Sequence, residues 1–161
     1  MPIPIHLIVE GETQGKIDGS CTIQGRENTI LVEKLDHSVF IPSDPQSGLP
    51  TGKRIHGPLT VTQMIDKSTP KLFQALCSGE HLKNVTLDFY QISKQGKEEK
   101  YFTTKLENAV VVKMSPWIPN VLQKENHDLQ HMLDVSFTYE KIIWTWVKDG
   151  IETEDSWQVP K

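Results

Sequence analysis

Apolar and polar residues alternate along most of the chain with a period of two, which is typical of half-buried β-strands. Polar, glycine-containing segments such as residues 10–15 and 94–100 separate the alternating runs and predict turns. We therefore predict about eight strands and no internal repeat. The strand-like segments are residues 3–9, 17–23, 30–41, 59–65, 85–93, 101–106, 109–114 and 133–146.

The C-terminal third is expected to contain a loop at residues 115–126, one long final strand and a polar tail from Lys148. The alternation places Trp144 and Trp146 on one face of this strand. The opposite face is expected to carry Leu133, Val135, Phe137, Tyr139, Lys141 and Ile143.

The period changes once, where the chain predicts a helix at about residues 70–78. Ser68 or Thr69 can cap its start, Pro70 suits its first turn, and Gly79 is a typical stop. A helix of about ten residues is marginal alone, so it must pack its apolar face onto a sheet. That face carries Leu72, Phe73, Ala75 and Leu76. We expect Leu72, Phe73 and Leu76 to make the packing contacts.

Many strands and one helix predict a mainly β fold. We expect a closed β-barrel or sandwich of antiparallel strands, one flanking α-helix and a long extended loop at about residues 42–58. With 161 residues the chain fits a single domain, residues 1–161, with room for a hydrophobic core.

The long loop is the most unusual segment of the sequence. Its four prolines, at positions 42, 45, 50 and 58, exclude a helix or a central strand. They also lower the entropy lost on ordering, while Arg54 and His56 supply contacts that a plain linker lacks. Since a long connection inside a compact domain is usually functional, we interpret it as an arm that touches something outside its own domain.

Composition narrows the function classes. The net charge of −4 and the pI near 5.8 do not favour nucleic-acid binding. No apolar window is long enough for membrane insertion, and the N-terminus does not resemble a signal peptide, so we expect synthesis in the cytoplasm. Cys21 and Cys77 are too far apart for a zinc pair and are expected to be free thiols.

Candidate chemistry is sparse, and we expect no catalytic residue, cofactor or metal. His127 and His131 are spaced as metal ligands on a helix would be, but they lie next to a predicted strand and lack a metalloprotease glutamate. Two alternatives to a structural role stay open. One is an intracellular β-barrel that binds a small ligand through Trp144 and Trp146, and the other is a metal-dependent hydrolase around His127 and His131.

Residues along nearly the whole chain also match one family. In and before the loop these are Leu35, Asp36, His37, Pro42, Asp44, Ser47, Gly48, Pro50, Gly52, Arg54, His56 and Pro58. Around the helix they are residues 66–68, Pro70, Leu72, Ala75, Leu76, Gly79 and Glu80. Elsewhere they are residues 10–11, 14–15, 101–102, 106–109 and 135–142. The sequence thereby resembles the haemolysin-coregulated proteins (Hcp), the tube subunits of type VI secretion systems; residues 17–26 and 120–131 depart from the family pattern.

The resemblance implies a β-barrel with a flanking helix, assembled into homohexameric rings that stack into a tube, as in contractile phage tails. Implied partners are other copies of the chain, a spike protein of the VgrG type, contractile sheath and baseplate components, and secreted effectors. Such a subunit leaves the cell without a signal peptide. We expect the inter-subunit loop to use Asp44, Ser47, Gly48, Pro50, Arg54 and His56, since a projecting arm suits the heterologous contact of a ring.

Overall fold

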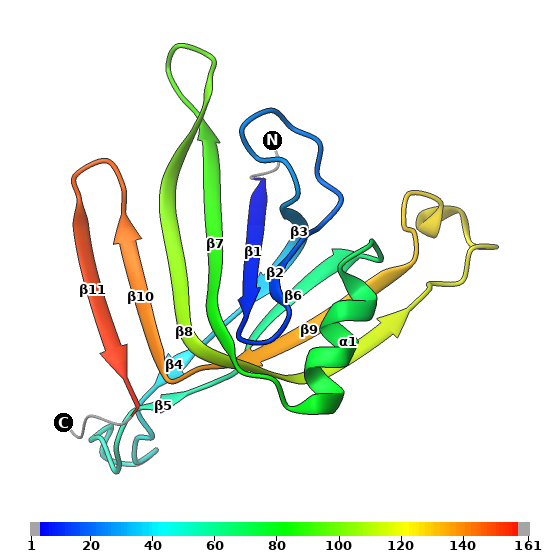
Figure 1. Cartoon of the computed structure of the whole chain (residues 1–161). Coiled ribbons are helices and arrows are strands. Elements are labelled where there is room, and N and C mark those ends of the chain that lie inside the picture. Colours follow the sequence, from blue (N-terminus) through cyan, green and yellow to red (C-terminus); the bar gives the residue numbers. More distant parts are fainter. Residues whose placement is uncertain (1–3, 158–161) are drawn as a thin grey trace.

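The computed structural model describes residues 4–157, which form a mainly β fold with one α-helix (Figure 1). The strands are β1 (Ile5–Gly11), β2 (Gly15–Ile17), β3 (Ile30–Asp36), β4 (Val39–Phe40), β5 (Ile55–His56), β6 (Leu59–Met64), β7 (Leu82–Ile92), β8 (Glu98–Trp117), β9 (Met132–Thr138), β10 (Lys141–Trp146) and β11 (Ile151–Ser156). The helices are α1 (Thr69–Ser78) and a short 3₁₀ helix, η1 (Lys124–Asn126).

Six of these strands close into an antiparallel barrel in the order β8-β7-β1-β3-β6-β9, and β8 pairs with β9 to complete the ring. β8 can pair with two different strands of the barrel because it is 20 residues long. Its first half pairs with β7 and its second half pairs with β9. Asn108, at a positive φ of 51°, lies near the end of the first half, and a bulge between Val111 and Lys113 lies near the start of the second. Such irregularities bend a strand. The predicted closed barrel with a flanking helix is confirmed.

α1 packs on the barrel through the apolar face that its sequence predicts. Leu72 and Ala75 are fully buried in the same core cluster as the inward side chains of the barrel strands. Gly79 ends the helix in the left-handed conformation, and Glu80 N donates to Ala75 O at 3.0 Å. Ser68 is the N-cap residue, but its hydroxyl binds the Asp66 carboxylate and does not cap the helix.

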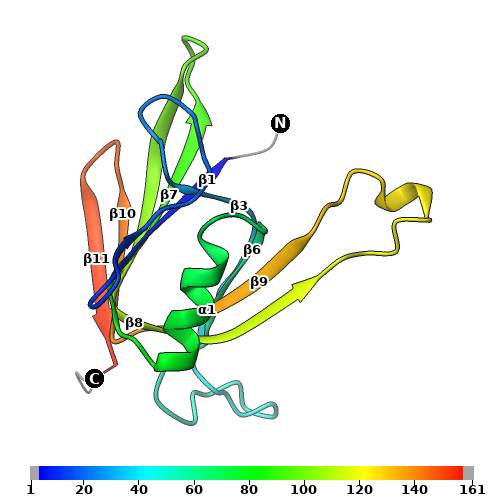
Figure 2. The same ribbon diagram turned by 45° about the vertical axis from the view of Figure 1, so that its right-hand side comes forward.

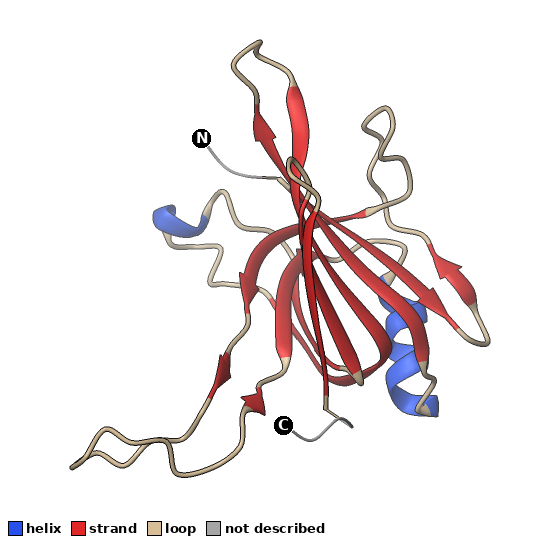
Figure 3. Cartoon of the chain, turned by 90° about the vertical axis from the view of Figure 1, so that its left-hand side faces the viewer, coloured by secondary structure: helices blue, strands red, loops and turns tan. Residues whose placement is uncertain are grey.

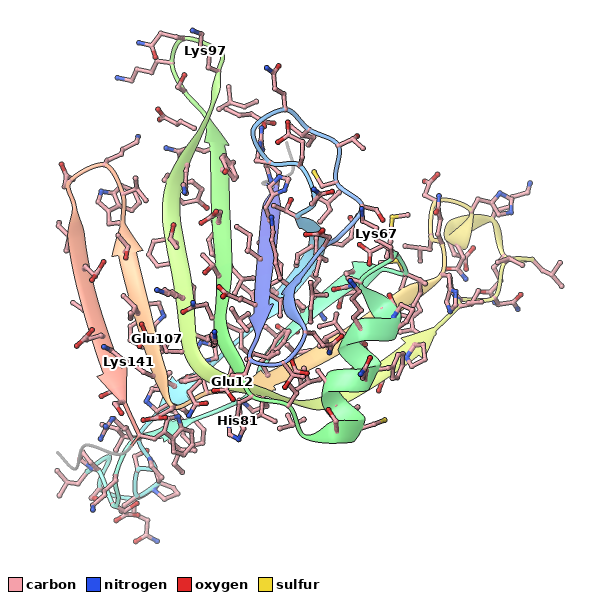
Figure 4. The ribbon with its side chains drawn as sticks, viewed as in Figure 1. Glu12, Lys67, His81, Lys97, Glu107 and Lys141 are labelled. Carbon is pink, nitrogen blue, oxygen red and sulfur yellow. The ribbon has the colours of Figure 1, made fainter. Side chains whose placement is uncertain are left out.

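The hairpin β10–β11 continues the sheet beyond the barrel by pairing with the first half of β8 (Figure 1). Charged side chains link its strands: Lys141 Nζ lies 3.9 Å from Glu107 Oε2 on β8 and 3.0 Å from Glu154 Oε2 on β11. Figure 4 shows Glu107 and Lys141 side by side on this surface. The bonds to Glu154, more than the nearby Glu107, raise the pKa of Lys141.

Two long loops leave the barrel in different directions (Figures 2 and 3). The first arm, residues 41–54, connects β4 to β5, which pair with each other as a separate two-stranded sheet. The second arm, residues 118–131, connects β8 to β9 and contains η1. The first arm corresponds to the predicted extended loop.

Several predicted strand boundaries are wrong. Residues 18–23 belong to a loop because they bond within residues 18–29, for example through Asn28 N to Cys21 O at 2.9 Å. Residues 30–41 form two strands, β3 and β4, whereas the two runs at 101–106 and 109–114 form the single strand β8. β8 also extends to Trp117, into the predicted loop. The predicted start of the first strand at Ile3 lies outside the described residues.

The C-terminal prediction is wrong at two points. The final strand is broken at residues 139–140 into β9 and β10, so Ile142 faces the core and Ile143 is only half-buried. The predicted polar tail contains β11, which pairs with β10 along its whole length. Residues 4–157 therefore contain eleven strands instead of about eight.

Candidate functional site: the first arm and its base

The tip of the first arm is closed by its own backbone and by one aspartate. Asp44 N donates to Leu49 O and Gly48 N donates to Asp44 O, each at 2.8 Å. The Asp44 carboxylate accepts bonds from Gln46 N at 3.0 Å and from Ser47 Oγ at 2.9 Å. These bonds, with the backbone bond first, lower the pKa of Asp44. Gly48 permits this turn because its φ is 73°, in the region that side chains disfavour.

The base of the first arm is held by a cluster of polar side chains, which we call the base cluster and which comprises His37, Arg54, His56, Tyr139 and Asp155. Arg54 Nε binds Asp155 Oδ2, and Arg54 Nη2 donates to Ser156 O at 2.8 Å. His56 Nε2 lies 2.7 Å from the same Asp155 oxygen, and His56 Nδ1 lies 2.6 Å from Tyr139 Oη. The cluster therefore ties β5 to the β9–β10 turn and to β11.

One set of donors satisfies all these contacts. His56 Nε2 can donate to the Asp155 carboxylate, and His56 Nδ1 can then accept from the Tyr139 hydroxyl. Tyr139 Oη can then accept from His37 Nε2 at 2.9 Å. The ring of Trp157 covers His56 at a centroid distance of 5.1 Å. The result is a continuous relay from His37 to Asp155, in which His56 and Tyr139 are buried.

The pKa shifts within the base cluster favour a structural role, in which the cluster holds the first arm in place. Burial, and then the Asp155 carboxylate, raise the pKa of Tyr139 well above its usual range, so this hydroxyl stays protonated at neutral pH. Burial, with nearby His56, lowers the pKa of His37. A nucleophile or general base needs the opposite shift at the tyrosine and access to a substrate. The arrangement is suited to fixing the direction of the arm.

The predicted loop residues thus fall into two groups. Asp44, Ser47, Gly48 and Pro50 lie at the tip, where Ser43 and Pro50 form a short β-bridge. Arg54 and His56 lie at the base and contact their own chain. Exposed apolar side chains accompany the arm at Val39, Phe40, Ile41, Leu49 and Ile55.

The predicted helix residues all lie on the side of α1 that meets the barrel. Leu72 is fully buried, while Phe73 and Leu76 are half-buried and pack against the core cluster. Both cysteines are free thiols in the described residues, with Cys77 exposed on α1 and Cys21 half-buried.

The residues of the two alternative functions are not assembled into sites. His127 and His131 are exposed in the second arm, and no group of three metal-binding side chains occurs in residues 4–157. Trp144 packs against the core cluster, and Trp146 Nε1 donates to Asp149 Oδ2 at 3.0 Å. Within residues 4–157, neither helix has the length and apolar character needed to span a membrane.

Sequence reasoning missed three members of the base cluster. His37 and Tyr139 were placed on strands, and Asp155 was placed in the polar tail. The pairing of Asp155 with Arg54 spans 101 residues and depends on β11, whose sequence carries one large apolar residue, Ile151. Alternation could not reveal this strand, although the aromatic Trp157 directly after it was a weak signal.

The described residues define a six-stranded antiparallel barrel with one flanking helix and an anchored, projecting arm. The family model described as "Type VI secretion system effector, Hcp" matches residues 7–146. The chain belongs to this family, the Hcp proteins of type VI secretion systems, and the resemblance inferred from the sequence is confirmed.

Individual relatives agree with this assignment. The chain is 38% identical to the "Major exported protein" of Pseudomonas aeruginosa, over 99% of this chain and 98% of that protein. A crystal structure of an Hcp protein has a TM-score of 0.91 at 33% identity, covering 99% of this chain and all of the other. The Hcp1 protein of Escherichia coli EAEC 042 has a TM-score of 0.85 at 38% identity, covering 97% and 99% of the two chains.

Proposed function

We propose that the protein is a structural tube subunit of a type VI secretion system, which assembles into homohexameric rings that stack into the inner tube. The observation that carries this proposal is the first arm. It has a closed tip, exposed apolar residues and a base locked to the barrel, so it is presented in one fixed direction. A preorganised arm loses little entropy when it docks on a neighbour.

The same proposal covers the fate and the partners of the tube. The subunit is made in the cytoplasm and exported, and the name of the Pseudomonas aeruginosa relative supports export. The tube carries effectors, is capped by a spike protein of the VgrG type, and contacts sheath and baseplate components. The family assignment supports these roles.

We further propose that residues 1–161 form one domain with a structural function that is not enzymatic. It needs no cofactor, binds no nucleic acid and does not insert into membranes. The closed barrel and the shared core of α1 support the single domain. In this proposal Leu72, Phe73 and Leu76 hold the helix, and Asp44, Ser47, Gly48 and Pro50 meet the neighbouring ring, while Arg54 and His56 position them.

The test is a shortened first arm. Replacing residues 44–50 by a two-residue Gly-Ser turn keeps Arg54 and the base cluster, so thermal stability is expected to stay near that of the unchanged protein. Rings are expected to persist in native mass spectrometry, while stacked tubes disappear from electron micrographs. Intact tubes from the shortened protein would show that the arm is not the stacking contact. A monomeric unchanged protein at tens of micromolar would overturn the proposed function itself.

A further inference from the structure

The second arm exposes apolar side chains without any contact that accounts for them. Leu122 is 89% exposed at its tip, the most exposed of the large apolar residues in residues 4–157. Its exposed apolar companions are Trp117, Ile118, Val121 and Leu129. A cluster of this kind on a soluble protein marks an interaction surface.

The polar side chains of the second arm fix its shape. Asn126 Nδ2 donates to Asn120 O at 3.0 Å and to Gln123 Oε1 at 3.2 Å. Asn120 Oδ1 in turn accepts from Leu122 N at 3.0 Å. These bonds join residues at most six apart, so the tip is ordered by itself and presents its apolar side chains on a preformed turn.

An apolar pocket lies at the root of the same arm. It has a volume of about 390 Å³ between the loop of residues 18–29, β3 and β6. Its apolar lining consists of Cys21, Ile23, Leu31, Met64 and Ile65. Met64 pairs with Met132 of β9, and Ile65 N donates to His131 O at 3.0 Å, which places the pocket next to the start of β9.

We propose that the apolar tip of the second arm, residues 118–122, occupies this pocket on a second copy of the chain. The arm projects away from its own barrel (Figure 2), so its tip is directed away from its own pocket. The apolar tip and the pocket are different patches of one chain. Such a heterologous contact repeats head to tail until it closes into a ring. This inference rests on the proposed function and names the contact that closes the ring.

Charge complements this apolar contact. Lys124 is exposed two residues after Leu122, and the pocket rim carries the carboxylates of Glu33 and Asp66. Burial of a leucine side chain contributes enough to change the dissociation constant of one contact by about 10- to 100-fold. Leu122 is therefore expected to supply most of the binding free energy of this contact. The charges of Lys124, Glu33 and Asp66 are expected to orient the contact more than to strengthen it.

The native Cys21 in the pocket allows a direct test by cross-linking. Leu122→Cys in a Cys77→Ser background is expected to form disulfides with Cys21 of the next copy on mild oxidation, giving a ladder of covalent species up to six chains on a denaturing gel. Two controls share this background. Leu49→Cys, at the tip of the first arm, and Leu122→Cys with Cys21→Ser are both expected to give no ladder.

A second pair of variants protects the test from unfavourable disulfide geometry. Leu122→Asp and Ile23→Asp are each expected to weaken ring formation at least about tenfold in native mass spectrometry, with unchanged circular dichroism. The proposal is overturned if both variants form rings as the unchanged protein does, or if cross-linking persists without Cys21, because the latter indicates tip-to-tip contact. If these results are obtained while the unchanged protein forms rings, only this contact is contradicted. If the unchanged protein forms no rings, the proposed function itself is contradicted.

Discussion

The two arms of this barrel are ordered by different means. The first arm is fixed at its base by side chains from β5, the β9–β10 turn and β11, and its key contacts join residues 83 to 102 positions apart. The second arm is fixed at its tip by bonds between residues at most six positions apart. The first arm therefore depends on the integrity of the whole fold, while the second depends mainly on its own sequence.

This difference fits different tasks. An arm locked at its base keeps one direction relative to the barrel, which suits contact with a neighbouring ring. An arm with a preformed tip keeps its apolar surface in one arrangement, which suits the proposed closing of a ring. Four predictions test the contrast, in order of decreasing effect.

The largest effect is expected from Asp155→Ala. This change removes the acceptor shared by Arg54 and His56 in the base cluster, and loss of this partly buried, charged acceptor is expected to cost about 2 kcal/mol in the free energy of unfolding. Urea denaturation measures the loss, and hydrogen exchange is expected to rise in residues 41–54 but not in residues 118–131. Asp149→Ala, which removes only the exposed bond from Trp146 Nε1 on the turn of the same hairpin, is the control and should change stability by about 0.5 kcal/mol or less. Equal losses in the free energy of unfolding for the two variants would contradict a role of the base cluster in fixing the first arm.

Acidification is expected to weaken the first arm. Burial lowers the pKa of His37 from 6.5, so near and below this pH the unfolded chain binds more protons than the folded one. The free energy of unfolding therefore falls as the pH falls through this window. His6, whose pKa burial and Arg26 also lower, contributes to the same fall. Unfolding midpoints measured from pH 8 to pH 5 should decline less steeply for His37→Gln, which keeps a donor for Tyr139; identical slopes would exclude a role for His37.

A smaller effect is expected from Gly48→Ala at the tip of the first arm. A β-carbon there meets no other atom within 4 Å, so the cost is only that of the positive φ, about 1 kcal/mol. Gly52→Ala is the matched control, because its β-carbon would make only ordinary contacts with Pro42. Thermal unfolding should separate the two variants. A destabilisation as large as that of Asp155→Ala would mean that the tip, and not the base, determines the order of the arm.

The smallest global effect is expected from Asn126→Ala. Its side chain orders only the tip of the second arm, so the free energy of unfolding should change by about 0.5 kcal/mol or less. Hydrogen exchange of residues 120–127 should nevertheless increase several-fold, and Gln130→Ala in the same arm should leave it unchanged. Loss of protection throughout the barrel would show that the second arm is coupled to the fold as strongly as the first.

Much of this architecture follows from the sequence alone. Alternation identified most barrel strands, and Ser68, Pro70 and Gly79 bounded the helix, because these signals act over a few residues. Prolines and glycines identified the first arm for the same reason. The break at residues 139–140 was missed because Tyr139 continues the alternation of Leu133, Val135 and Phe137, and neither glycine nor proline marks the turn.

The tertiary structure decided what depends on distant pairing. β8 closes the barrel only because β9 is there to pair with its second half, and β11 exists as a strand only because β10 offers an edge. Asp155 reaches Arg54 and His56 through that strand, so the base of the first arm could not be read from its own residues. A polar segment such as residues 152–155 has no alternation of its own, and the free energy of its pairing comes from a partner that the local sequence does not specify.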